Sequence, residues 1–98
     1  MMTFEAFKQT LHDPEPPRNT SVMMQALWYA ARDNWDKAHD LVQDFPSGDG
    51  AWIHAYLHRV EGDLGNAAYW YSRAGKPVDT GSLDSEWERI ARELLSRQ

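Results

Sequence analysis

Apolar residues recur along most of this chain with the spacing of amphipathic α-helices. Near the N-terminus one stripe comprises Phe4, Phe7 and Leu11. Near the C-terminus another comprises Leu83, Trp87, Ile90 and Leu94. Steps of three and four residues place such positions on one face of a helix. We therefore predict helices over residues 3–12, with Thr3 as the N-cap, and over residues 83–97.

Proline and glycine divide the chain between these two helices. Pro14, Pro16 and Pro17 lie within residues 13–19, where they exclude a helix and predict an extended strap. The run Pro-Ser-Gly-Asp-Gly at 46–50 separates two further helical stretches, and Gly62-Asp63 forms a turn within the second of them. The pattern predicts a helical hairpin over residues 20–45 and another over residues 51–77, with Gly75 ending the last helix.

The two predicted hairpins are copies of one design. Ala26 corresponds to Ala55 and Ala38 to Ala67, in each case 29 positions further along the chain. Small residues at fixed points let two helix backbones approach closely, while large neighbours fill the flanks. We predict a single all-α domain over residues 1–98, in which two antiparallel hairpins stack between an N-terminal and a C-terminal helix. A stripe through the second hairpin is expected to face the core: Ile53, Leu57, Val60 and Leu64.

The second hairpin resembles the tetratricopeptide repeat. The resemblance rests on residues 62–67, which read Gly-Asp-Leu-Gly-Asn-Ala, followed by Tyr71, Ala74 and Pro77. It implies a protein-interaction module of the helical-repeat type, although the spacing of 29 is shorter than the usual 34. Residues 51–59 and 69–77 are also similar to a conserved family of small proteins of unassigned function, and that likeness implies no activity.

Composition excludes several classes of function. The formal net charge of −5 disfavours nucleic acid as a partner, and the chain has no cysteine for a disulfide or a thiolate metal site. We expect a cytoplasmic protein, because the sequence has neither a secretory signal nor an apolar run long enough for a membrane. No nucleophile motif or phosphate-binding glycine loop is present, so we favour a protein that is not an enzyme and expect no cofactor.

Trp52, Tyr56 and Arg59 lie on one flank of the predicted helix that follows Gly50. Aromatic residues and arginine dominate the energy of protein interfaces, so this flank is the expected surface for a protein or peptide partner. Packing of Trp52 and Tyr56 on the first hairpin is the alternative. Homodimerisation through uncovered apolar surface is a further one.

His54, His58 and Glu61 lie on another flank of the same helix. Histidines at i and i+4 can share a metal ion, and Glu61 would supply a third ligand. The alternative function is therefore a metal or small-molecule site, with or without enzymatic activity. Hydrogen bonding of these polar residues to a neighbouring hairpin is the simpler explanation. His12 and His39 are isolated in the sequence, and we expect both at the surface.

Overall fold

The computed structural model describes residues 2–97, and this part of the chain contains six α-helices and one short 3₁₀ helix but no strand. The elements are α1 (Phe4–Gln9), η1 (Thr10–His12), α2 (Val22–Ala31), α3 (Trp35–Val42), α4 (Gly48–Val60), α5 (Leu64–Ala74) and α6 (Leu83–Ser96). None of these helices is both long enough and apolar enough to cross a lipid bilayer.

Polar side chains start most of the helices where the sequence places them. Thr3, Ser21 and Ser82 each accept a hydrogen bond from the backbone N–H three residues further on, which satisfies a donor that the helix leaves free. Ser82 therefore caps α6. Gly75 ends α5 with a φ of +70°, a conformation that costs glycine no steric strain. Strap residues 13–19 contain no helix.

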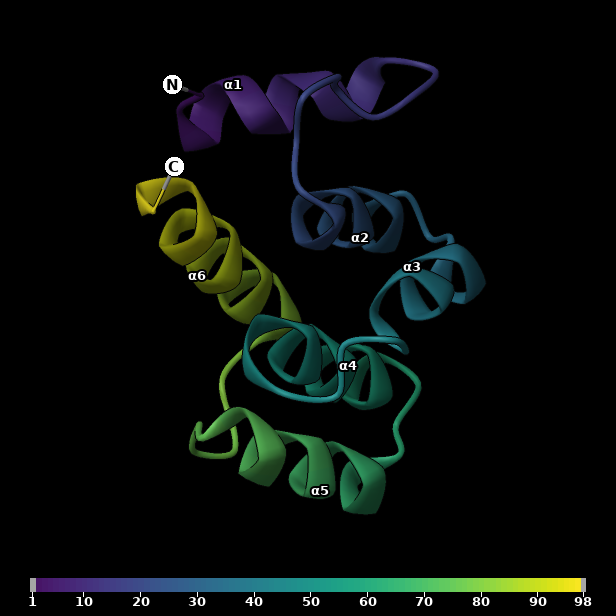
Figure 1. The fold of residues 1–98 in the computed structure, drawn as a ribbon, viewed down its shortest axis with the longest axis vertical. Coiled ribbons are helices and arrows are strands. Elements are labelled where there is room, and N and C mark those ends of the chain that lie inside the picture. Colours follow the sequence, from purple (N-terminus) through teal and green to yellow (C-terminus); the bar gives the residue numbers. More distant parts are fainter. Residues whose placement is uncertain (1, 98) are drawn as a thin grey trace.

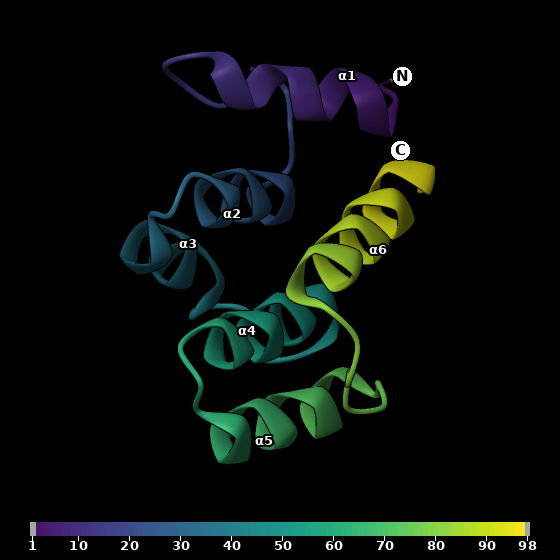
Figure 2. The ribbon, with the colours of Figure 1, turned by 180° about the vertical axis from the view of Figure 1, so that it is seen from behind.

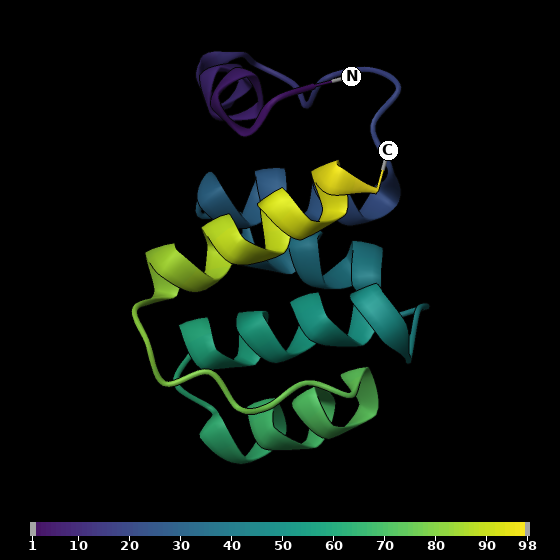
Figure 3. The same ribbon diagram turned by 90° about the vertical axis from the view of Figure 1, so that its left-hand side faces the viewer.

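The predicted all-α arrangement of two stacked hairpins is confirmed. α2 packs on α3 and α4 packs on α5, and the second hairpin lies against the first through contacts of α4 with α2 and α3 (Figure 1). α6 crosses the molecule from α4 towards α1, so that it covers both hairpins (Figure 2). The segment between α5 and α6 runs back along α5 and α4 (Figure 3).

α4 is the central helix, and every residue from Gly50 to His58 is buried. A helix that is enclosed on all sides has no solvent face on which to place polar side chains. The four repeat alanines pack at the helix contacts with at most 1% exposure: Ala26, Ala38, Ala55 and Ala67.

Two details of the second hairpin differ from the sequence prediction. α4 begins at Gly48 instead of Ala51. Its first turn includes Gly50, where a Cβ atom would lie 2.4 Å from the Cβ of Phe45, so the close approach of Phe45 requires glycine at this position. The expected core stripe also ends early, since Val60 is 42% exposed and Leu64 is 67% exposed. Both residues flank the turn between α4 and α5, where no other helix covers them.

The alanine contacts provide a test of the packing. Replacing buried Ala67 with Leu adds volume at a close helix contact and should lower the free energy of unfolding by about 1–3 kcal/mol. The adjacent Ala68 is exposed, so Ala68→Leu is the matched control and should change stability by less than about 0.5 kcal/mol. Urea unfolding of both variants measures the difference. Equal stability of the two variants would contradict the contact.

Candidate metal centre

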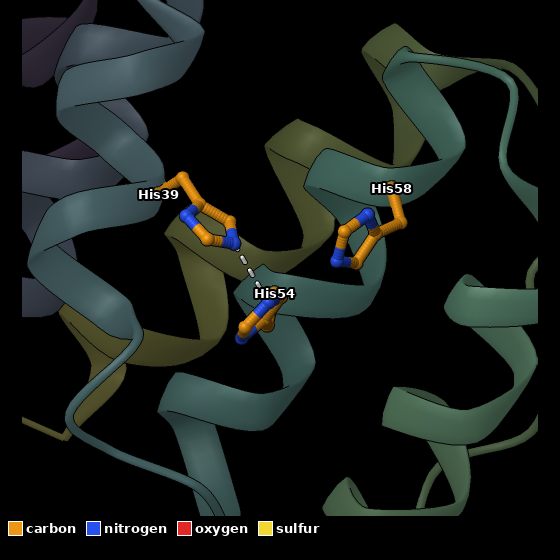
Figure 4. A group of neighbouring side chains, drawn as sticks. All are labelled: His39, His54 and His58. Atoms are coloured by element: carbon orange, nitrogen blue, oxygen red, sulfur yellow. Dashed lines mark hydrogen bonds between the residues drawn. The ribbon is translucent and has the colours of Figure 1, made fainter.

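Three histidines meet where the two hairpins join. His39 comes from α3, whereas His54 and His58 lie one turn apart on α4 (Figure 4). One ring nitrogen of each residue lies within 4.8 Å of the corresponding atoms of the other two. His54 and His58 are buried and His39 is half-buried, so the cluster is largely shielded from water.

The imidazole rings contact one another directly. Nε2 of His39 lies 3.0 Å from Nε2 of His54, a hydrogen-bond distance at which one of the two nitrogens donates. The rings of His54 and His58 are stacked, with centroids 4.9 Å apart. Nδ1 of His54 is buried and has no hydrogen-bond partner among the described residues. The cluster therefore leaves buried hydrogen-bonding capacity unused, which normally costs stability.

Two tryptophans hold the rings in place. The ring of Trp35 stacks on His39 with a centroid distance of 4.8 Å, and the ring of Trp70 stacks on His54 at 3.9 Å. Trp35 is itself anchored, because its Nε1–H donates to the backbone carbonyl of Leu57 over 2.7 Å. α3, α4 and α5 thus each contribute to the position of the histidines.

Burial favours the neutral form of His54. Desolvation lowers the pKa of His54 to about 4, and the nearby His39 and His58 act in the same direction. A neutral imidazole retains a lone pair, so at neutral pH no proton has to leave His54 before it binds a metal ion.

Glu61 orients His58. Its Oε1 lies 2.6 Å from Nδ1 of His58, and the carboxylate side chain remains 40% exposed. When Nδ1–H donates to Glu61, the lone pair of His58 is on Nε2, which points towards the space beside His39 and His54 (Figure 4). The structure thus brings the predicted His54, His58 and Glu61 together, with Glu61 placed to support a ligand.

The expected isolation of His39 is wrong. Sequence spacing relates residues only within one helix, and His39 reaches His54 across the joint between hairpins. One signal was present: His39 follows Trp35 by four residues, so both side chains lie on the same face of α3. Stacked hairpins place such a face against the helix that carries His54 and His58.

Trp52, Tyr56 and Arg59 do not form an exposed flank. Trp52 and Tyr56 are each 6% exposed, and the side chain of Arg59 is 12% exposed. Both aromatic residues belong to the buried core, and α6 packs against the helix that carries them. Burial also raises the pKa of the Tyr56 hydroxyl to about 12.

Arg59 completes a buried ionic network. It donates to Oε1 of Glu86 at 2.7 Å, and the Tyr71 hydroxyl donates to Oε2 of the same carboxylate at 2.5 Å. Glu86 is fully buried, and desolvation raises its pKa while the bonds from Tyr71 and Arg59 oppose that rise. Arg59 also lies 3.6 Å from Asp79. These contacts tie α4 to α5 and α6, which is a structural role.

Comparisons with known proteins add no further assignment. No family model matches the chain, and no curated protein or solved structure matches it either. The likeness to the tetratricopeptide repeat therefore stays a prediction.

The lowered pKa of His54 predicts acid sensitivity of the metal-free protein. In the unfolded chain His54 takes up a proton near pH 6.5, but in the folded chain only near pH 4. Its contribution to stability is therefore complete above pH 6.5 and decreases as the pH falls towards 4. With a chelator present, wild type should lose about 2 kcal/mol more than His54→Phe between about pH 8 and pH 5.

Urea unfolding at several pH values measures this difference. His12→Ala removes an exposed histidine in η1 and should retain the wild-type pH dependence. Parallel pH profiles for wild type and His54→Phe would contradict a lowered pKa of His54.

The ionic network predicts a structural role for Arg59. Arg59→Ala leaves Glu86 buried without its cation and should reduce the free energy of unfolding by about 3–5 kcal/mol. Arg18→Ala in the exposed strap is the control and should change it by less than about 0.5 kcal/mol. Full stability of Arg59→Ala would instead show that Arg59 is free for another role.

Proposed function

We propose that this protein binds a divalent transition-metal ion, Zn²⁺ in the first place, through His39, His54 and His58. The observation that carries the proposal is the convergence of three ring nitrogens within 4.8 Å, in a largely buried position between two hairpins. Within the cluster a hydrogen bond joins Nε2 of His39 to Nε2 of His54, and an ion held by these two nitrogens would replace it.

The distances suit such an ion after small side-chain adjustments. Zn–N bonds measure about 2.0–2.1 Å, so two nitrogen ligands of a tetrahedral site lie about 3.3–3.4 Å apart. His39 and His54 have nearly this separation, at 3.0 Å. Rotation of the His58 ring about its side-chain torsions would bring its Nε2 to the same distance, while Glu61 accepts from Nδ1.

The donor atoms define the class of metal. Imidazole nitrogens suit Zn²⁺, Cu²⁺, Ni²⁺ and Co²⁺, whereas Mg²⁺ and Ca²⁺ prefer carboxylate, carbonyl and water oxygens. The supporting residue Glu61 resembles the carboxylates that commonly orient metal-bound histidines in proteins. A metal ion here would link α3 of the first hairpin to α4 of the second, so binding would stabilise the joint between the two hairpins.

A protein-interaction role, which the sequence favours first, stays a prediction. Trp52, Tyr56 and Arg59 were expected to carry it, and all three are largely enclosed by the fold. Their burial makes the histidine cluster the better supported site.

Thermal unfolding with and without zinc tests the proposal. An ion that binds only the folded state at about 100 times its Kd adds about 2.7 kcal/mol of stability. In a domain of this size this raises Tm by about 10 °C or more. Magnesium at the same concentration should have no effect.

Three variants separate the proposed ligands from the rest of the protein. His39→Ala, at a half-buried position, should abolish the zinc-dependent rise, and Glu61→Gln should weaken zinc binding about 10–100-fold. His12→Ala should behave as wild type. The proposal fails if Tm does not respond to millimolar zinc, or if His39→Ala retains the full response.

A further inference from the structure

A small cavity lies between the turn of the first hairpin and the end of α4. It measures about 210 Å³, and its lining residues are Ala30, Asp33, Trp35, Leu57 and Val60. Four of the five are apolar, and the only ionisable group among them is the carboxylate of Asp33. Pockets for drug-sized ligands measure about 300–1,000 Å³, so a cavity of this size suits one amino-acid side chain better than a cofactor.

Apolar surface next to the cavity is exposed. Val60 lines the cavity and is 42% exposed, and Leu64, four residues further along, is 67% exposed. Both belong to the stripe that the sequence assigns to the core. Val60 is therefore an apolar lining residue that is open to solvent, and such a residue can contribute to an interaction surface.

The backbone of Asp33 has an unusual conformation. Its φ is +58°, in the left-handed region that glycine adopts at little cost. The repeat places Gly62 at the equivalent position of the second hairpin, 29 residues later, with a φ of +84°. The first hairpin thus accepts a less favourable residue at its turn, and that residue supplies the carboxylate of the cavity.

Several exposed carboxylates lie at this end of the molecule, and Arg32, the basic neighbour of Asp33, is engaged by the backbone carbonyls of Leu11 and Asp13. Asp33 is exposed, the neighbouring turn between α4 and α5 carries exposed Glu61 and Asp63, and the whole chain has a net charge of −5. An apolar cavity with an acidic rim is complementary to an apolar group flanked by positive charge.

We propose that this cavity is a docking site for a peptide segment that places an apolar side chain next to a lysine or arginine. The apolar side chain enters between Trp35, Leu57 and Val60, and the basic group pairs with Asp33. The site contains none of His39, His54 and His58, although it shares Trp35 with the histidine cluster. It differs from the flank of Trp52, Tyr56 and Arg59 on which the sequence places a partner.

Fluorescence anisotropy with labelled peptides tests the proposal in the presence of a chelator. The probe is a heptapeptide of alternating lysine and leucine, and the controls replace its lysines with glutamate or its leucines with glycine. The lysine–leucine peptide should bind, whereas both control peptides should bind at least about tenfold more weakly. Equal binding of the glycine peptide would mean charge attraction alone and would overturn the proposal.

A matched pair of protein variants locates the site. Asp33→Asn keeps a residue that tolerates the left-handed conformation but removes the charge, and it should weaken peptide binding about threefold to fivefold. Asp44→Asn makes the same charge change at an exposed position beyond the other end of α3 and should leave binding unchanged. Equal effects of the two variants would overturn the proposal.

Analytical ultracentrifugation tests whether a second copy of this chain, instead of a peptide, occupies the site. The proposal expects a monomer at the concentrations of the peptide titration. A dimer that Val60→Asp dissociates, together with no binding of the lysine–leucine peptide, would assign the surface to self-association and overturn the proposal. Zinc titration of Asp33→Asn keeps the two sites distinct, because loss of peptide binding should leave the zinc-dependent rise in Tm unchanged.

Discussion

The enclosure of α4 is the constraint on which the rest of the structure depends. α2, α3, α5 and α6 all pack against this one helix, and it has no exposed residue between Gly50 and His58. Every polar side chain on it must therefore find a partner inside the protein or bear the cost of desolvation. The flank of Trp52, Tyr56 and Arg59, which the sequence suggests as a binding surface, is therefore enclosed by the fold. The polar residues of α4 fall into two buried clusters, the histidine cluster and the ionic network around Glu86.

The two clusters differ in how their buried polar groups are paired. Glu86 receives hydrogen bonds from Arg59 and Tyr71, and Asp79 pairs with both Arg59 and Arg89, so two carboxylates meet two guanidinium groups and the charges balance. The histidine cluster has one internal hydrogen bond, between His39 and His54, and Nδ1 of His54 has no partner among the described residues. Because its charges are balanced within the protein, the network around Glu86 can be buried without a bound ligand. The histidine cluster, by contrast, brings together three ring nitrogens that a cation could share.

The repeat also explains where the two halves differ. Both hairpins place alanines at the same contacts, yet the turn of the first contains Asp33 where the second contains Gly62. Because the hairpins stack, the first turn lies beside the end of α4 and forms a cavity that neither hairpin has by itself. The two proposed sites are therefore both products of stacking, and Trp35 contributes to each of them.

Local sequence determined the helices, their caps, the proline strap and the copying of one hairpin, because periodicity, capping and turn preferences act within a few residues. It also paired His54 with His58 and Glu61, since one helix face carries all three. Only the tertiary structure decided that His39 joins them, that α6 covers Trp52 and Tyr56, and that Val60 and Leu64 stay exposed. Those outcomes depend on which helices become neighbours. Hydrophobic periodicity relates residues within one helix only, so it does not predict contacts between residues of different helices.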